Sequence, residues 1–306
     1  MTPADLLELL AHDRVLLMGV VNVTPDSFSD GGRFFDHGAA VAHGLQLVAE
    51  GADIVDVGGE STRPGAEPVG VEEELRRVVP VVRELAAAGV AVSIDTRHAD
   101  VAEEALVAGA VLVNDITGLR DGAMRAVAAR HGVAAVAMHM SVADPAVMQQ
   151  HTTYSDVVNE VVAFLAAHAT IAMMEGVPAV IVDPGIGFGK TPQQNAELLR
   201  RVNEIVALGH PVLVGASRKS FIGTLAGGVA AVDRLPGTLA AHLSAVTGGA
   251  RLVRVHDVAA HRQALEVWRH VVPGRGLEPL YAGPKPAVLP LNDPGENEPH
   301  DIGDKP

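Results

Sequence analysis

The sequence predicts an α/β fold: a single (β/α)8 TIM barrel with a short N-terminal helix and a disordered C-terminal tail. Short apolar runs alternate with longer helical patterns, which is the pattern of a parallel sheet wrapped by helices. The runs are apolar almost throughout, as in strands that are covered on both faces. With 306 residues, 48% of them hydrophobic, the chain is long enough to bury the core of one large domain.

Eight apolar runs are expected to form the strands of the barrel. They span 16–21, 53–57, 91–94, 111–113, 134–138, 179–182, 211–214 and 252–255. A helix over 71–88 opens with an acidic turn and ends before Gly89. Farther along, 183–193 leads into a helix over 194–208, which Gly209 closes.

The two ends of the chain differ from the barrel. Residues 2–12 have the amphipathic pattern of a short helix laid across the barrel bottom or entrance. From Pro273 onward the chain is rich in Pro, Gly, Asn and acidic residues and has no apolar periodicity, which predicts a disordered tail. The expected organisation is an N-terminal extension over 1–14, a barrel domain over 15–275 and a tail over 276–306.

Composition limits both the chemistry and the partners. The chain has no cysteine, which excludes disulfides, Cys-ligated zinc, iron–sulfur clusters and thiol nucleophiles. A formal net charge of -14 argues against binding to nucleic acid or to an anionic membrane, so an anionic small substrate needs a local cluster of positive groups. The apolar run over 15–21 is too short to span a bilayer, and we expect a cytoplasmic protein.

Polar side chains follow most of the predicted strands, at the point where each strand ends. They are Asn22, Asp95, Asn114, Asp115, His139, Asp183, Ser217, Arg218, Lys219, Arg254 and His256. The carboxyl ends of the strands form the active site of a TIM barrel. Asp and Asn can also cap helices, but caps alone do not explain polar ends at so many strands.

These residue types favour two neighbouring sites. The first set combines carboxylates, an amide and a cation: Asp95, Asn114, Asp183 and Lys219. Such a set suits a flat heterocycle with a donor edge and a carbonyl, such as a pterin. Arg254 and His256 offer an anion site where TIM barrels often hold phosphate, and the loop after Asn22 is placed to close over that anion.

Other patterns receive a simpler interpretation. Residues 185–191 resemble a P-loop, but the first glycine that this motif requires falls on Pro184. His139 is expected in the core or behind the site. Asp56 and Asp115 are expected to support neighbouring ligand residues. No zinc site is expected, because metal-ligand spacing is missing among His98, His131, His151, His168 and His261.

Several segments match family signatures in order along the chain. The first two are long and specific: MGVVNVTPDSFSDGG over 18–32 and DVGGESTRPG over 56–65. The others are SIDT over 93–96, VND over 113–115, DPGIGFGK over 183–190, GASRKSF over 215–221 and RVHD over 254–257. Together they resemble the dihydropteroate synthases, pterin-binding TIM-barrel enzymes, over roughly residues 15–271.

The resemblance implies an activity in folate biosynthesis. Enzymes of this family condense 6-hydroxymethyl-7,8-dihydropterin pyrophosphate with 4-aminobenzoate to give 7,8-dihydropteroate and pyrophosphate. The family also implies a Mg²⁺ cofactor, a homodimer and inhibition by sulfonamides. Two alternatives remain. A methyltetrahydrofolate corrinoid methyltransferase would share the pterin contacts without needing the two long loop motifs, and a silent pterin-binding paralogue would be expected to have lost Lys219, Arg254 or the first loop.

By the same resemblance, individual positions take roles. The pterin ring would be bound by Asp95, Asn114, Met138, Asp183, Phe188 and Lys219. Pyrophosphate would be bound by Asn22, Thr62, Arg63, Arg254 and His256, with Asn22 also a Mg²⁺ ligand. The aminobenzoate pocket would be built by Phe28, Pro64 and Ser220. The residues expected to contribute to catalysis are Asp95, Lys219, Arg254 and His256.

Overall fold

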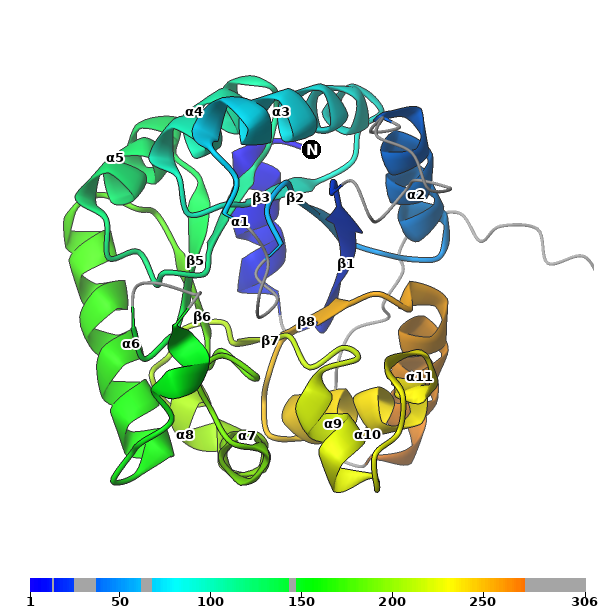
Figure 1. Ribbon diagram of the computed structural model, residues 1–306. Coiled ribbons are helices and arrows are strands. Elements are labelled where there is room, and N and C mark those ends of the chain that lie inside the picture. Colours follow the sequence, from blue (N-terminus) through cyan, green and yellow to red (C-terminus); the bar gives the residue numbers. More distant parts are fainter. Residues whose placement is uncertain (13, 25–36, 62–67, 143–146, 273–306) are drawn as a thin grey trace, which may run out of the picture.

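The computed structural model describes residues 1–12, 14–24, 37–61, 68–142 and 147–272. Within these residues, eight parallel strands form the predicted barrel (Figure 1). They are β1 (Leu16–Asn22), β2 (Ile54–Gly58), β3 (Val92–Asp95), β4 (Leu112–Asp115), β5 (Ala134–Met138), β6 (Val180–Asp183), β7 (Leu213–Val214) and β8 (Leu252–Val255). The strand order is β6, β5, β4, β3, β2, β1, β8, β7.

The barrel is nearly closed between β6 and β7. The amide of Val182 donates to the carbonyl of Pro211 at 2.9 Å, and Val182 forms a parallel bridge with Val212. β7 is only two residues long, shorter than the predicted run over 211–214. Pro211 has no N–H, so it cannot donate to a strand ladder.

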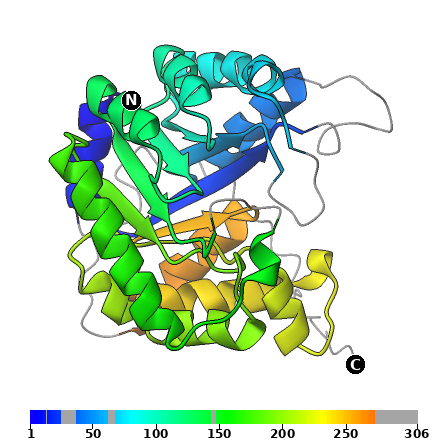
Figure 2. The same cartoon turned by 60° about the vertical axis from the view of Figure 1, so that its left-hand side comes forward.

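Helices occupy the connections and surround the strands (Figures 1 and 2). They are α2 (His37–Ala49), α3 (Val71–Ala87), α4 (Ala99–Val107), α5 (Gly122–His131), α6 (Val157–Met174), α7 (Pro192–Arg200), α8 (Val202–Val206), α9 (Ser220–Leu225), α10 (Leu235–Thr247) and α11 (Val258–Val271), with 3-10 turns at Met148–Gln150 and Ala231–Asp233. Among the described residues, α6 alone has the length and composition of a membrane span. Its residues Val158, Val161 and Leu165 are buried in the same core as the strands.

Helix α3 agrees with its predicted range to within one residue, whereas the segment over 194–208 differs from its prediction. α3 ends one residue before the predicted end of 71–88, and Gly89 has a φ of 82° just beyond it. The prediction of one helix over 194–208 is wrong, because the chain forms α7 and α8, divided at Arg201. α7 begins earlier than expected because Thr191 starts it with a capping box.

Helix α1 (Pro3–Ala11) closes the amino-terminal end of the barrel. The side chain of Thr2 caps this helix. Leu6 and Leu10 are buried in a cluster with the first residues of several strands, among them Leu16 and Leu252. The helix therefore lies at the barrel bottom, which is one of the two positions predicted for it. The predicted tail over 276–306 lies outside the described residues.

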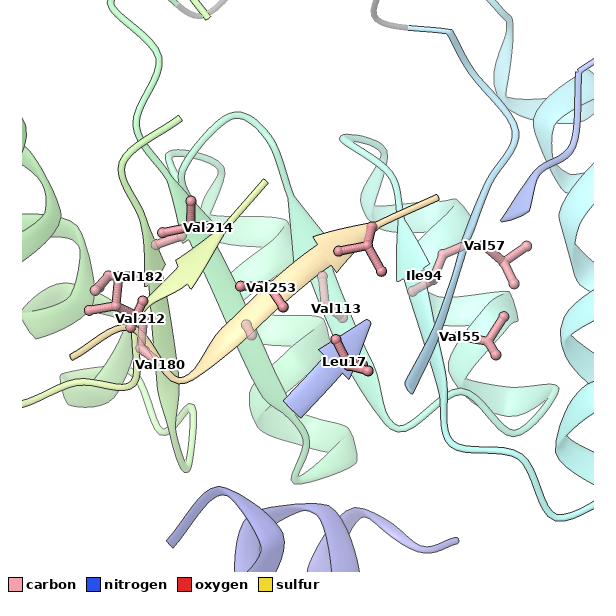
Figure 3. Packing of buried hydrophobic residues seen from close by; sticks show 14 of the residues in the cluster. Leu17, Val55, Val57, Ile94, Val113, Val180, Val182, Val212, Val214 and Val253 are labelled. Carbon is pink, nitrogen blue, oxygen red and sulfur yellow. The ribbon is translucent and has the colours of Figure 1, made fainter. Parts of the chain in front are cut away.

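The strands are buried on both faces, as their apolar sequences predict. In β2, Ile54 packs in the cluster that contains α1, whereas Val55 and Val57 pack in the cluster that contains the surrounding helices. Figure 3 shows part of this outer core, including Val113, Val182 and Val253. Because side chains alternate along a strand, Asp56 points to the barrel interior between these two valines.

Candidate active site

A pocket opens at the carboxyl ends of the strands. It has about 500 Å³ of free space, counting its open mouth, and both polar and apolar side chains line it. Its lining consists of Val20, Asp95, Asn114, Ile116, Met138, Asp183, Phe188, Gly215, Ser217, Lys219, Arg254 and His256. The structure thus brings together every residue predicted to contact a pterin, with two of the residues predicted to bind pyrophosphate.

Strand register places several of these side chains next to one another. Asp95 at the end of β3 is the register partner of Asn114 on β4. Met138 at the end of β5 is the partner of Asp183 on β6. Each of these residues follows an apolar run and ends or nearly ends its strand, so the parallel sheet gathers their side chains at one end of the barrel.

Arg254 joins two carboxylates inside the barrel. Its Nε donates to Oδ2 of Asp56 at 2.6 Å, and its Nη2 donates to Oδ2 of Asp95 at 2.6 Å. The same oxygen of Asp56 accepts a hydrogen bond from Nδ2 of Asn114 at 3.0 Å. Asp56 is buried and does not line the pocket. It therefore holds Arg254 and Asn114 from behind, in the supporting position predicted for it.

These contacts set the protonation of the cluster. Burial raises the pKa of Asp95 to about 7, an effect that the charge of Arg254 opposes and the charge of Asp56 reinforces. Burial lowers the pKa of Arg254, but the two carboxylates more than offset this, so its pKa lies above the ordinary value. The pocket therefore holds a permanent cation beside a carboxyl group that titrates near neutral pH.

Asp183 and Lys219 add a carboxylate and an ammonium group to the pocket. Oδ1 of Asp183 accepts a hydrogen bond from the amide of Gly185 at 2.7 Å. Burial raises the pKa of Asp183, and the charge of Lys219 opposes this rise. Nζ of Lys219 donates to the carbonyl of Ile186 and lies 4.5 Å from the ring centroid of Phe188. Burial lowers the pKa of Lys219 to about 8, and the charge of Asp183 opposes this fall.

The turn after β6 brings the backbone close to the end of β5. Gly185 has a φ of 66°, and a Cβ there would lie 1.9 Å from the carbonyl oxygen of His139, so only glycine fits. Nζ of Lys190 donates to the carbonyls of Gly185 and Phe188 at 2.9 and 3.0 Å. It also donates to Nδ1 of His139 at 3.0 Å. The buried ammonium group thus holds the turn that presents Phe188 to the pocket.

Lys190 is a supporting residue to which the sequence pattern gave no role. Burial lowers the pKa of Lys190 to about 7. Burial and the charge of Lys190 lower the pKa of His139 to about 2, so His139 is neutral and its Nδ1 can accept a hydrogen bond. His139 lies behind the pocket, as expected. The segment does not act as a P-loop, because Nζ of Lys190 donates to carbonyls of its own turn. In the sequence, the signal for Lys190 is a lysine within an apolar, glycine-rich segment.

The loop after β7 is tied to the end of β8 at the pocket. Oγ of Ser217 accepts a hydrogen bond from the amide of His256 at 3.2 Å and lies 2.9 Å from its Nδ1. Arg218 does not line the pocket, and its guanidinium pairs with Asp257 at 2.5 and 3.0 Å.

Two of the predicted site residues are described and do not line this pocket. Asn22 is the half-buried last residue of β1, and Ser220 is exposed at the start of α9. Phe28, Thr62, Arg63 and Pro64 lie outside the described residues. The predicted aminobenzoate pocket therefore cannot be assembled from the part of the chain that the structure describes.

Asn22 is the predicted Mg²⁺ ligand. The described residues contain no group of three or more His, Asp or Glu side chains arranged to hold a metal ion. Mg²⁺ usually keeps several waters and takes one or two protein oxygens together with phosphate oxygens of a ligand. The side-chain amide oxygen of Asn22 can serve as a metal ligand at the pocket end of β1. It therefore suits a Mg²⁺ ion that binds together with a phosphorylated ligand.

Comparison with known proteins identifies relatives over most of the chain. The family model described as pterin binding enzyme matches residues 18–256. A dihydropteroate synthase from Mycobacterium leprae (strain TN) is 50% identical over 270 residues, which is 85% of this chain and 95% of that protein.

Solved structures agree with this result. Dihydropteroate synthase from Thermus thermophilus in complex with 4-aminobenzoate is 57% identical, with a TM-score of 0.78, over 85% of this chain and 95% of that chain. The enzyme from the same organism in complex with 6HMPPP is 54% identical, with a TM-score of 0.76, over 85% of this chain and 94% of that chain.

Proposed function

The chain belongs to the dihydropteroate synthase family of pterin-binding enzymes, and we propose on this premise that it joins 6-hydroxymethyl-7,8-dihydropterin pyrophosphate to 4-aminobenzoate. The products are 7,8-dihydropteroate and pyrophosphate, so the protein is a transferase of folate biosynthesis. The observation that carries this function is one pocket in which Asp183, Asn114 and Lys219 meet Arg254 at the carboxyl ends of the strands.

The pterin ring occupies the inner part of this pocket. The carboxylate of Asp183 accepts hydrogen bonds from the 2-amino group and the adjacent ring N–H, and Nζ of Lys219 donates to the ring carbonyl. Asn114 and Asp95 serve the other edge of the ring. The faces of the ring contact apolar side chains, of which Phe188 is held in place by the turn after β6.

The pyrophosphate group lies toward Arg254 and His256 at the end of β8. The C–O bond of the pterin CH₂ group breaks, and its electron pair leaves with pyrophosphate. Arg254 and His256 stabilise the charge that develops on the leaving group. Thr62 and Arg63 are expected to add to this anion site from the second loop. A Mg²⁺ ion held by Asn22 would supply further neutralisation of that charge.

The amine of 4-aminobenzoate then forms the new C–N bond with its own lone pair. The pterin methylene carries cationic character at this stage, and the neighbouring carboxylate of Asp95 stabilises it electrostatically. The arylamine proton leaves to solvent or to pyrophosphate, so a strong general base is not required. Phe28, Pro64 and Ser220 are expected to bind the aminobenzoate ring.

The remaining expectations extend this proposal. We expect a cytoplasmic protein, because a chain without cysteine shows no adaptation to an oxidising compartment, and a homodimer, because the family is usually dimeric. Sedimentation velocity measures the oligomeric state. We also expect sulfonamides to compete with 4-aminobenzoate, since they copy its shape and charge, and steady-state inhibition patterns test this expectation.

The decisive experiment measures dihydropteroate formation from both substrates, with and without Mg²⁺. Pyrophosphate release in the absence of 4-aminobenzoate is the control, because hydrolysis alone would also release pyrophosphate. The proposal requires stoichiometric formation of dihydropteroate and pyrophosphate. Binding of the pterin without turnover would instead favour a silent pterin-binding protein.

A further inference from the structure

The loop that carries Lys219 has a strained backbone. Arg218 has a φ of 58°, a conformation that residues with a side chain rarely adopt. Its amide donates to Oγ1 of Thr238 at 3.1 Å, and its guanidinium pairs with Asp257. Strained conformations of this kind persist only where the surroundings hold them. The position of Lys219, the next residue, therefore depends on the contacts that fix this loop.

A chain of three hydrogen bonds ties the same loop to α11 through two histidines. The amide of Ala216 donates to Nε2 of His242 on α10 at 2.9 Å. Nδ1 of His242 lies 2.9 Å from Nε2 of His261 on α11. Nδ1 of His261 lies 2.7 Å from the carbonyl oxygen of Asp257. The two histidines are only 1% and 2% exposed. Since Asp257 directly follows His256, the chain connects the two loops that meet at the pocket.

The groups at the two ends of the chain fix where its protons lie. The carbonyl of Asp257 can only accept, so His261 carries a proton on Nδ1. The amide of Ala216 can only donate, so His242 offers the lone pair of Nε2. His242 therefore donates from Nδ1 to Nε2 of His261, and both rings are neutral. One more proton on either ring would place two N–H groups face to face.

The surroundings favour the neutral form of both rings. Burial lowers the pKa of His242 well below its ordinary value, and His261 and the charge of Lys219 act in the same direction. Burial also lowers the pKa of His261, although the hydrogen bond to the carbonyl of Asp257 and the charge of Asp257 oppose this.

We propose that His242 and His261 are positioning residues for the reaction. The two neutral, hydrogen-bonded rings form a relay between the amide of Ala216 and the carbonyl of Asp257. This relay fixes the positions of Ser217 and Lys219 relative to the neighbouring loop that carries His256. Neither histidine lines the pocket, and both act through the amide of Ala216. The kinetic part of this inference rests on the proposed function.

The chain offers a matched control between the same two helices. Nε1 of Trp268 on α11 donates to Oγ1 of Thr247 on α10 at 3.0 Å. Trp268 is also buried, and neither residue lines the pocket. Trp268→Phe thus removes a buried α10–α11 hydrogen bond without touching the loop after β7.

The first experiment compares steady-state kinetics and melting temperatures of three variants. His242→Phe keeps a buried ring but leaves the amide of Ala216 without an acceptor, so we expect the KM for the pterin substrate to rise and kcat/KM to fall about tenfold. His242→Gln restores part of this loss, because its Oε1 can replace Nε2 as the acceptor. Trp268→Phe lowers the melting temperature and leaves the kinetic constants unchanged. Wild-type constants for His242→Phe, or equal kinetic losses in His242→Phe and Trp268→Phe, would overturn the proposal.

The second experiment remains decisive if His242→Phe does not fold. Imidazole ¹⁵N chemical shifts of the wild-type protein at neutral pH report the tautomer of each ring, with His242→Gln and His261→Phe used to assign the signals. We expect a protonated Nδ1 and an unprotonated Nε2 on both histidines. A proton on Nε2 of either ring in an active wild-type enzyme would overturn the relay, whereas a wild type unable to form dihydropteroate would overturn the proposed function.

Discussion

Nη2 of Arg254 lies 2.6 Å from Oδ2 of Asp95, although 159 positions separate the two residues in the chain. The first is expected to bind the leaving pyrophosphate, and the second is expected to face the pterin. This ion pair therefore connects the expected binding positions of the pterin and of the pyrophosphate group within one cluster. Because burial keeps the pKa of Asp95 near 7, the negative charge of the cluster changes within the neutral pH range.

Asp95→Asn should make the melting temperature less sensitive to pH. The pKa of Asp95 is raised from 3.8 to about 7 in the folded protein, so its contribution to stability is fully present below about pH 4 and is lost as the pH rises through 7. The melting temperature of the variant minus that of the wild type should therefore be more positive at pH 8 than at pH 5. Circular dichroism measures both temperatures.

The control for this effect is Asp100→Asn, on the exposed surface of α4. Any change with pH that both variants share does not come from the buried carboxyl group of Asp95. If the melting temperature of Asp95→Asn minus that of the wild type is constant from pH 5 to pH 8, this carboxyl group does not titrate with a raised pKa.

Lys219 should produce an alkaline limb in the pH dependence of catalysis. Its pKa is lowered from 10.5 to about 8, so the ammonium form that donates to the pterin is lost as the pH rises through 8. We expect kcat/KM for the pterin substrate to fall above pH 8, since this constant reports the free enzyme. The side chain of Lys219→Arg stays protonated, so the alkaline limb should be absent in this variant even if its maximal kcat/KM is lower than that of the wild type. An unchanged limb in this variant would assign the titration to another group.

Asp183→Asn should weaken recognition of the pterin edge. The change keeps the size of the side chain but replaces an acceptor by a group that also carries a donor. We expect kcat/KM for the pterin substrate to fall by an amount equivalent to about 2–4 kcal/mol. Wild-type kinetics would remove Asp183 from the pterin site, and calorimetric titration with a pterin separates a loss of binding from a loss of turnover.

Lys190→Met should lower the free energy of unfolding by about 2–4 kcal/mol, because two carbonyls in the turn after β6 would lose their buried Nζ donor. The KM for the pterin substrate should rise as well, since Phe188 depends on this turn. Urea unfolding measures the first effect. Arg200→Met, on the exposed surface of α7, is the control and should lower the free energy of unfolding much less. Equal losses in the two variants would contradict the bracing role of Lys190.

The strand ends are the part of the site that can be predicted from sequence. Asp95, Asn114 and Asp183 each follow or end an apolar run, and parallel strands of a barrel present their carboxyl ends on the same side. Local sequence therefore places these side chains near one another without any knowledge of helix packing. The closure of the barrel follows from the same repeated pattern.

Contacts between side chains of distant elements cannot be predicted in this way. His242 and His261 lie on two separate helices, and only the packing of α10 against α11 brings their rings together. The buried ammonium of Lys190 likewise depends on how the turn after β6 folds back onto β5. The division of 194–208 into two helices is a further tertiary effect, since no glycine or proline marks Arg201 in the sequence.

The position of α1 has a practical use in measuring ligands. Because this helix packs against the amino ends of the strands, Met1 lies at the opposite end of the barrel from the pocket and is 46% exposed. A biotin group attached there would orient every immobilised molecule on a biosensor with its pocket toward the flowing solution. Pterins, aminobenzoate and inhibitors could then be titrated on one surface, free of steric hindrance from the support.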